Sequence, residues 1–369
     1  MKTETIAIHG GNAVTDSLKP VIQPITLSST FEHQEESMLY GRLENPNRKS
    51  LERVMAALEK GLDAAAFASG NAAANAVFQA LPAGSHIIAP DDMYHGLKSL
   101  LETVYKDKLK IDFINLTEPA LVEKAITADT RLLWIESPSN PLLKISDINR
   151  LSAIAHAKGL SVVVDNTFAS PIFQQPLLEG ADMVMHSNTK YIGGHSDIIG
   201  GILITGEIND FWKGIKTVQK LAGAVPSPFD TYFLTRSIKT LPYRMQAHAA
   251  NAGTIAGFLA QHPSVETVYY PGLETHNGHA VARSQMKGFG GMLSFVIKGN
   301  ARAADRFIEE LRYFTNATSL GGVESLIERR SRIQGVSEGI PEQLIRMSVG
   351  LENVNDLLED LEKGLQILQ

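Results

Sequence analysis

Cysteine is absent from this chain of 369 residues, and so is any long apolar run. Without cysteine there is no disulfide framework, thiolate metal site or cysteine nucleophile. A membrane-spanning helix needs about 20 consecutive apolar residues, which the chain nowhere provides. The first residues, from Met1 to Ile6, also lack the apolar core of a signal peptide. These absences predict a cytoplasmic protein without a membrane partner.

A basic excess is missing as well. The chain has 34 lysines and arginines against 40 acidic residues, a formal net charge of -6 and an isoelectric point near 6.0. General nucleic-acid binding requires a basic face, so we expect no nucleic-acid partner. The one basic cluster, at 329–332, is interpreted as a solvated turn unless a ligand uses it.

Histidine and glycine patterns do not indicate a bound metal or dinucleotide. None of the eleven histidines belongs to a His-Glu-x-x-His motif, and the glycine pairs do not form a dinucleotide fingerprint. We therefore predict no metal site.

Strand-like apolar runs alternate with helical patterns over the central part of the chain, after a first segment rich in turn-forming residues. The expected strands are 64–68, 85–89, 131–135, 160–164, 183–185 and 202–205. The expected helices are one from Lys49 to a stop at Gly61, one at 71–81, and one capped by Ser146 and ended by Gly159. The alternation indicates an α/β fold with a mostly parallel sheet covered on both faces.

The length of the chain favours two domains. A long helical stretch at 229–261 is expected to lead to a second unit with strands at 292–297 and 345–349 and helices at 301–311 and 353–368. We predict an extended arm at 1–45, a main domain at 46–235 and a smaller C-terminal α/β domain at 236–369.

Two of the expected strands end in residues that suit a cofactor. One ends at Asp165, and the other leads into Ser187, Thr189 and Lys190. Ligands of such sheets bind beyond the carboxyl ends of the strands. Pyridoxal phosphate (PLP) needs a carboxylate at its pyridine nitrogen, an amine for a Schiff base and hydroxyls for its phosphate. We therefore predict a PLP site, with an exposed loop lysine and a structural salt bridge or helix cap at Asp165 as the alternatives.

Three further features support a PLP enzyme. Ser69, Gly70 and Asn71 open a helix, whose free N–H groups would cradle a phosphate. Tyr94 could stack on a flat ring, and an inward-facing Arg346 would clamp an α-carboxylate. The alternatives are an ordinary strand-to-helix turn, a half-buried loop tyrosine and a surface charge.

Ordered motifs run through nearly the whole chain. They are Gln23-Pro24-Ile25, Tyr40-Gly41-Arg42 with Asn45-Pro46, Ser69-Gly70, Tyr94, Glu136-Ser137-Pro138-Ser139-Asn140-Pro141, Asp165-Asn166-Thr167, Ser187-Asn188-Thr189-Lys190-Tyr191, Ser319-Leu320-Gly321-Gly322, and Arg346 through Glu352. With these motifs the chain closely resembles the Cys/Met-metabolism family of PLP enzymes from about Thr5 to the C-terminus. The resemblance implies fold type I of the PLP-dependent transferases, with a seven-stranded type of sheet, and a homotetramer built as a pair of dimers with shared active sites.

The resemblance also implies roles for residues outside the central sheet. Tyr40 and Arg42 should reach the cofactor phosphate of the neighbouring subunit, with Tyr40 also close to the substrate. Asn140 and Ser319 should help Arg346 to hold the substrate carboxylate.

The activity implied is γ-elimination or γ-replacement on sulfur amino acids or O-acylhomoserine, of the cystathionine γ-synthase or γ-lyase type. Tyr94 should stack on the ring, and Lys190 should move protons during the reaction. Methionine γ-lyase, cystathionine β-lyase and O-acylhomoserine sulfhydrylase are alternatives. A non-catalytic binding or scaffold relative is a further one, against which the complete set of site residues argues.

Two departures concern the distal end of the substrate. Cystathionine γ-synthases and γ-lyases usually carry a glutamate where Thr318 stands and an arginine where Ser99 stands, while the cysteine of methionine γ-lyases is Gly96 here. We hypothesise that a nearby cation replaces the missing distal contact. The candidates are Lys98, Arg329, Arg330 and Arg332.

Overall fold

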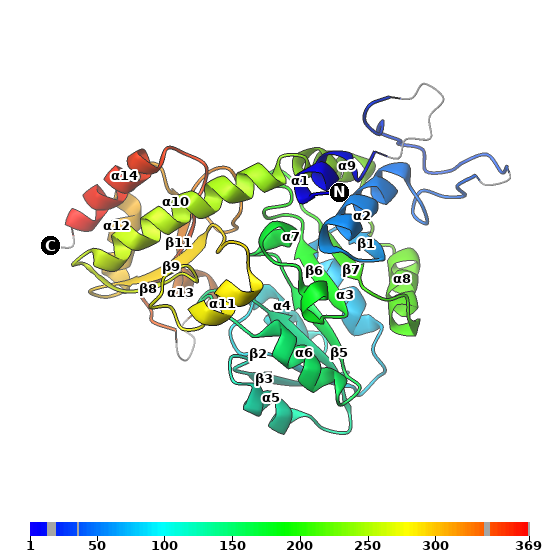
Figure 1. Cartoon of the computed structure of the whole chain (residues 1–369), viewed down its shortest axis with the longest axis horizontal. Coiled ribbons are helices and arrows are strands. Elements are labelled where there is room, and N and C mark those ends of the chain that lie inside the picture. Colours follow the sequence, from blue (N-terminus) through cyan, green and yellow to red (C-terminus); the bar gives the residue numbers. More distant parts are fainter. Residues whose placement is uncertain (13–19, 35–36, 336–339, 368–369) are drawn as a thin grey trace.

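The computed structural model describes residues 1–12, 20–34, 37–335 and 340–367, which form two sheets with helices packed around them (Figure 1). The larger sheet has seven strands in the order β1-β7-β6-β5-β4-β2-β3. They are β1 (Asp63–Phe67), β2 (His86–Pro90), β3 (Lys110–Ile114), β4 (Thr130–Glu136), β5 (Ser161–Asp165), β6 (Met183–Ser187) and β7 (Gly201–Thr205). Strand β7 is antiparallel to both β1 and β6, and the other pairs are parallel, which confirms the predicted α/β fold.

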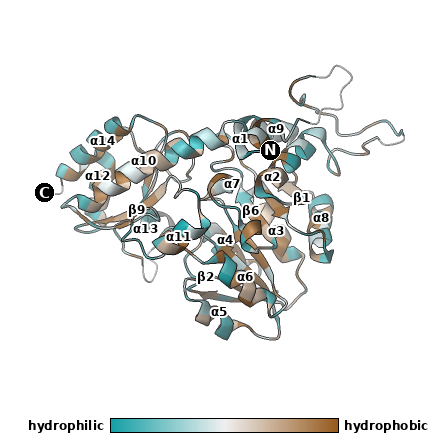
Figure 2. Cartoon of the chain, viewed as in Figure 1, coloured by the Kyte–Doolittle hydropathy of each residue, from teal (hydrophilic) through white to brown (hydrophobic). Residues whose placement is uncertain are grey.

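Helices cover both faces of this sheet, as its apolar strands require. They are α2 (Pro46–Glu59), α3 (Gly70–Gln79), α4 (His95–Thr103), α5 (Pro119–Ala125), α6 (Ile148–His156), α7 (Ser170–Phe173), α8 (Asp210–Ala222) and α9 (Pro228–Ile238), with a 3-10 turn at Pro176–Glu179. Alternate residues of β1 show the two layers: Ala65 and Phe67 belong to a core with α3 and α8, whereas Ala64 and Ala66 pack with α2. Helix α3, in the middle of one layer, is largely brown in the hydropathy view, whereas the outer helix α14 (Val354–Gln366) shows much teal (Figure 2).

The smaller sheet has five strands in the order β10-β11-β12-β9-β8. Its elements are α10 (Leu241–Gln261), β8 (Val265–Tyr269), α11 (His279–Gln285), β9 (Met292–Ile297), α12 (Ala301–Glu310), β10 (Thr315–Asn316), β11 (Leu326–Arg329), α13 (Arg330–Gln334), β12 (Leu344–Ser348) and α14. Apolar side chains such as Phe295 and Met347 pack under α10, α12 and α14. Polar residues alternate with them, and Glu328, Arg346 and Ser294 stand side by side on three neighbouring strands.

Several predicted elements differ from the structure. The first segment is not wholly extended, because α1 (Thr3–His9) buries Ile6 and Ala7 against α2. Asp147, rather than Ser146, caps α6 by accepting from the Arg150 N–H. The helical stretch at 229–261 is divided into α9 and α10.

The other predicted strands and helices lie within a few residues of those observed, although position 368, at the end of the last predicted helix, lies outside the described residues. Strand β3 was not predicted, since its charged residues interrupt the apolar pattern. None of the described helices is long and apolar enough to cross a membrane. The predicted domain limits at 45/46 and 235/236 stay predictions.

Candidate active site

A cavity of about 550 Å³ lies where the carboxyl ends of β4, β5 and β6 meet the polar side of the smaller sheet. It is lined from the larger sheet and its loops by Ser69, Gly70, Asn71, Tyr94, His95, Gly96, Glu136, Pro138, Asn140, Asp165, Thr167, Phe168, Met185, Ser187, Thr189, Lys190 and Ile199. Thr318, Ser319, Leu320, Arg330 and Arg346 line it from the C-terminal part. Most of the residues predicted for the site are therefore brought together, from segments far apart in the sequence.

Lys190 lies in the turn that follows β6, and its amine donates a hydrogen bond of 2.7 Å to Ser319 Oγ. Burial, and then the charge of Arg346, lower the pKa of Lys190 to about 8. At pH 7 roughly a tenth of this amine is therefore neutral, far more than for an ordinary lysine, and the neutral form is what a nucleophile or a general base requires.

The segment that carries Ser319 is fitted closely against the lysine turn. Gly321 has φ +76, and a Cβ atom there would lie 2.7 Å from the Tyr191 nitrogen, so a larger residue would displace the backbone. Ser319 itself has φ +96, a conformation that non-glycine residues rarely adopt. Strain of this kind is held where it serves a site, and here it places the serine hydroxyl on the lysine amine.

Asp165 ends β5 and is buried. Its Oδ1 atom accepts hydrogen bonds from the Thr167 N–H at 3.0 Å and the Thr167 hydroxyl at 2.5 Å. Burial nevertheless raises the pKa of Asp165, with the two hydrogen bonds acting in the opposite direction. Among the described residues no cation pairs with this carboxylate, so a bound cationic group would stabilise its ionised form.

Glu136 is a site residue that sequence reasoning missed. It ends β4 directly opposite Asp165, and its Oε2 accepts from the Tyr94 N–H at 2.9 Å. Burial, and then the neighbouring Asp165 carboxylate, raise the pKa of Glu136 well above its usual range. The signal was available, since Glu136 follows a predicted strand in the way that Asp165 does.

The beginning of α3 forms a small polar recess. Ser69 caps this helix by accepting from the Ala72 N–H at 3.1 Å, and the residues after it precede the first regular helical hydrogen bonds. Gly70 approaches Ser187 so closely that a Cβ atom would lie 3.0 Å from the serine oxygen. Thr189 stands on the same side, where its hydroxyl accepts from the Gly200 N–H at 3.1 Å. Helix N–H groups and hydroxyls in this arrangement suit a phosphate.

Arg346 projects from the middle of β12 into the other side of the cavity. Its Nη1 donates to Asn140 Oδ1 and its Nη2 to the Ser319 carbonyl oxygen, both at 3.0 Å, while Nη2 also lies 2.5 Å from Glu328 Oε1. Burial lowers the pKa of Arg346 to about 10, which leaves it charged at neutral pH. Asn140 and Ser319 thus contact this arginine, and their predicted help in holding a substrate carboxylate stays a prediction.

Tyr40 and Arg42 do not line the cavity of their own chain. The Arg42 guanidinium lies 5.5 Å above the Tyr40 ring and donates to the Lys220 carbonyl oxygen. Arg48 holds the turn that carries them, by donating to the carbonyl oxygens of Gly41, Arg42 and Leu43.

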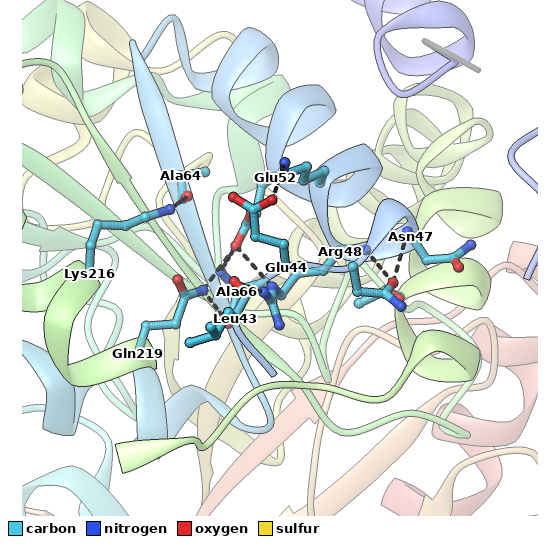
Figure 3. Close-up of polar contacts among 12 residues, drawn as sticks. Leu43, Glu44, Asn47, Arg48, Glu52, Ala64, Ala66, Lys216 and Gln219 are labelled. Atoms are coloured by element: carbon cyan, nitrogen blue, oxygen red, sulfur yellow. Dashed lines mark hydrogen bonds and ion pairs between the residues drawn. The ribbon is translucent and has the colours of Figure 1, made fainter. Parts of the chain in front are cut away.

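Behind that turn a polar network joins the arm to the larger sheet (Figure 3). Arg48 lies 3.8 Å from Glu52, and Glu52 Oε1 accepts from the Ala66 N–H of β1 and from Gln219 of α8, both at 2.9 Å. The turn at 41–43 is thereby fixed to β1, the strand that leads to Ser69. The prediction that Tyr40 and Arg42 serve a neighbouring subunit stays a prediction.

Of the four cations considered for the distal contact, Arg330 is the one that lines the cavity. Arg329 pairs with Asp305 at 2.7 and 2.9 Å, Arg332 is exposed, and the Lys98 amine lies 4.9 Å above the Phe113 ring. The interpretation of the basic cluster as a solvated turn is therefore wrong for Arg330, which is buried beside Glu328.

The sequence of the chain matches a known protein family. The family model of the Cys/Met metabolism PLP-dependent enzymes matches residues 4–366. The chain belongs to this family.

Relatives of the whole chain support the same conclusion. A cystathionine gamma-synthase of Mycobacterium leprae is 46% identical over 374 residues, covering 98% of this chain and 96% of the relative. A cystathionine gamma-lyase of Dictyostelium discoideum is 44% identical over 378 residues, covering 99% and 97%. The crystal structure of metB from Corynebacterium glutamicum has a TM-score of 0.97 at 39% identity, covering 100% of this chain and 99% of that one. The fold and the PLP cofactor predicted from the sequence are thus confirmed.

The residues of the cavity fit PLP. A buried carboxylate without a described cationic partner, an amine with a lowered pKa and a recess at a helix start correspond to the pyridine nitrogen, the aldehyde and the phosphate of this cofactor. No group of three or more metal-ligating side chains occurs among the residues that the structure describes.

Proposed function

We propose that this PLP-dependent enzyme makes or cleaves the Cγ–S bond of cystathionine, as a γ-synthase or a γ-lyase of transsulfuration. The single observation that carries the proposal is the contact of Lys190 with Ser319, because the same serine bonds Arg346 through its carbonyl oxygen. An amino acid whose carboxylate binds Arg346 therefore has its Cα close to the lysine amine. The relatives that are named cystathionine gamma-synthase and gamma-lyase support the choice of substrate.

The substrate carboxylate is held by Arg346, with Asn140 and Ser319 fixing the orientation of the guanidinium. A planar guanidinium offers two parallel N–H groups to a carboxylate, which fixes the direction of the bond to Cα. Orienting this bond is the contribution of the smaller sheet to the reaction.

Lys190 removes the proton from Cα and returns a proton later in the cycle. Its lowered pKa leaves part of the amine neutral and able to accept a proton near neutral pH. When bound, PLP supplies the electron sink that makes the Cα and Cβ protons of an amino acid removable.

The cofactor is held by residues of the larger sheet. Asp165 would keep the pyridine nitrogen of bound PLP protonated, and Tyr94 would offer its aromatic ring to the cofactor ring. The phosphate would be bound by the start of α3 and by two hydroxyls, a set formed by Ser69, Gly70, Asn71, Ser187 and Thr189. This division agrees with the polar groups that face the cavity.

The active enzyme is proposed to be a homotetramer in the cytoplasm, with Tyr40 and Arg42 completing the site of a neighbouring subunit. The exposed position of Tyr40 and the firm hold of Arg48 on the turn at 41–43 support this assembly. Size-exclusion chromatography with light scattering, applied to the unaltered protein, measures the number of subunits directly.

Product analysis of the PLP-loaded protein tests the proposed activity. Given L-cystathionine, it should release cysteine, 2-oxobutyrate and ammonia, or in the synthetic direction form cystathionine from cysteine and an O-acylhomoserine. Homocysteine with pyruvate would instead identify a β-lyase. Turnover of methionine, or of O-acylhomoserine with a simple thiol and not with cysteine, would identify the other members considered. Absence of every product would favour a binding or scaffold role.

A further inference from the structure

A buried row of charges crosses the polar side of the smaller sheet. Glu328 of β11 and Arg346 of β12 stand directly opposite each other, and Arg330 follows two residues after Glu328. All three side chains are buried, and Arg330 and Arg346 both line the cavity. One oxygen, Glu328 Oε1, forms an ion pair with both arginines: it lies 2.5 Å from Nη2 of Arg346 and accepts a hydrogen bond from Nη1 of Arg330.

This arrangement limits what Arg346 can offer to a substrate. Its Nη2 atom donates a hydrogen bond to the Ser319 carbonyl oxygen, and the negatively charged Glu328 Oε1 lies 2.5 Å from the same atom. A carboxylate that binds through two parallel N–H groups uses Nη2 together with either Nη1 or Nε. Glu328 is therefore an anion placed beside the atom of Arg346 that a substrate carboxylate would contact.

We propose that Arg330 is a positioning residue that retains Glu328 when the substrate carboxylate displaces this acid from Arg346. The inference rests on the proposed role of Arg346 as the carboxylate receptor. Glu328 Oε1 already contacts both arginines. The Glu328 side chain therefore has to move only a little to leave Arg346 and keep its contact with Arg330. Leaving a buried carboxylate without a cation would be unfavourable, and Arg330 avoids this by remaining as its partner.

The role differs from that of a distal contact. A residue that recognises the far end of the substrate affects only substrates with an anionic far end. A residue that acts through Glu328 and Arg346 affects every amino acid with an α-carboxylate, whatever its side chain. The two ligands L-serine and ethanolamine separate these roles, because they differ only in that carboxylate.

The experiment titrates both ligands into PLP-loaded protein and follows the cofactor absorbance. In Arg330→Met, Glu328 has only Arg346 left of the two arginines, so the Kd for L-serine should rise roughly 10-fold or more while that for ethanolamine stays unchanged. Adding Glu328→Gln to this variant removes the competing charge and should return the Kd for L-serine to within about threefold of the unaltered protein. Arg330→Lys keeps the cation and should retain most of the affinity.

Arg329→Gln is the matched control, since Arg329 pairs with Asp305 outside the cavity and its loss should leave both titrations unchanged. An unchanged Kd for L-serine in Arg330→Met, an equal loss for ethanolamine, or no recovery in the double variant would each overturn the proposal. Should Arg330→Met fail to fold, Arg330→Gln takes its place, alone and combined with Glu328→Gln, with the same expected results. The titration needs no turnover, so a failure to cleave cystathionine would contradict the proposed function and leave this result standing.

Discussion

The two sides of the cavity differ in whether their buried charged groups have ion-pair partners. On the side of the larger sheet, Asp165 and Glu136 lie next to each other without an ion pair among the described residues, and burial lowers the pKa of Lys190. On the side of the smaller sheet, Glu328 lies between Arg330 and Arg346, so opposite charges alternate. The two carboxylates of the first side have no ion-pair partner in the described chain, whereas the second side provides its own.

This difference indicates how each side treats its ligand. A carboxylate whose pKa is raised by burial gains most from an incoming cation, which favours binding of a protonated pyridine at Asp165. An arginine that already has a carboxylate partner gains less from a second one, so the substrate must compete with Glu328. We therefore expect strong retention of the cofactor and readily reversible binding of the amino acid.

The largest effect is expected from Lys190→Ala. Loss of the amine that moves protons should lower the turnover of L-cystathionine roughly a thousandfold or more. The melting temperature should not fall, because burial disfavours the charged form of this lysine in the folded protein. Initial rates and thermal unfolding of the same preparation check both statements. A variant that keeps most of its activity would show that the larger sheet does not supply the base.

A pair of substitutions with crossed effects tests the division between the two sides. Asp165→Asn removes the proposed charge partner of the pyridine nitrogen and should weaken PLP binding by about 10- to 100-fold. Arg346→Gln should leave PLP affinity nearly unchanged and raise the KM for the amino acid by a similar factor. Equilibrium dialysis against PLP and steady-state kinetics at saturating cofactor separate the two.

The crossed design carries its own control, since each variant serves as the reference for the other. If both weakened PLP equally, the two sheets would form one undivided site. If neither changed its expected quantity, the assignment of cofactor and substrate to separate sheets would be wrong.

The smallest effect concerns pH. Covalent capture of PLP by the apoprotein requires the neutral amine of Lys190, whose pKa is lowered from 10.5 to about 8 by burial and by Arg346. The capture rate should rise with pH to a plateau above about 8, and fall roughly tenfold per unit below it. Stopped-flow absorbance between pH 6 and 10 measures the profile.

The sign of the linked stability follows from the same shift. Between pH 8 and 10.5 the unfolded chain binds more protons at this lysine than the folded one, so the unfavourable contribution of Lys190 is relieved as the pH rises through this range. A midpoint of PLP capture near 10.5 would show that burial does not act on this amine as described.

The sequence predicted most of the larger sheet and most of the residues with which it lines the cavity, and the reasons are local. Apolar runs define β5 and β6, and a polar residue at the end of such a run must lie at the sheet edge where ligands bind, as Asp165 does. Lys190 was found by the same argument. Strand β3, with Lys110 and Asp112 among its residues, gave no such pattern.

The ion pairs on the side of the smaller sheet could not be predicted from local patterns. Glu328 was not singled out, because its contact with Arg346 depends on the antiparallel register of β11 and β12, which no local pattern specifies. Arg330 stood in a basic cluster whose members face different surroundings, and only packing distinguishes it from Arg329. The antiparallel direction of β7 could likewise not be predicted, because a short apolar run does not indicate the direction of a strand.

That reversal has a thermodynamic consequence for the lysine turn. Strands β6 and β7 follow each other in the chain and pair antiparallel, so residues 188–200 close a loop between adjacent strands without a crossover helix. The entropic cost of joining the two ends of a loop grows only slowly with its length. The turn that carries Lys190 is held in addition by its own backbone hydrogen bonds, from the N–H groups of Lys190, Gly193 and Gly194, so little of the free energy of cofactor binding has to offset the ordering of this segment.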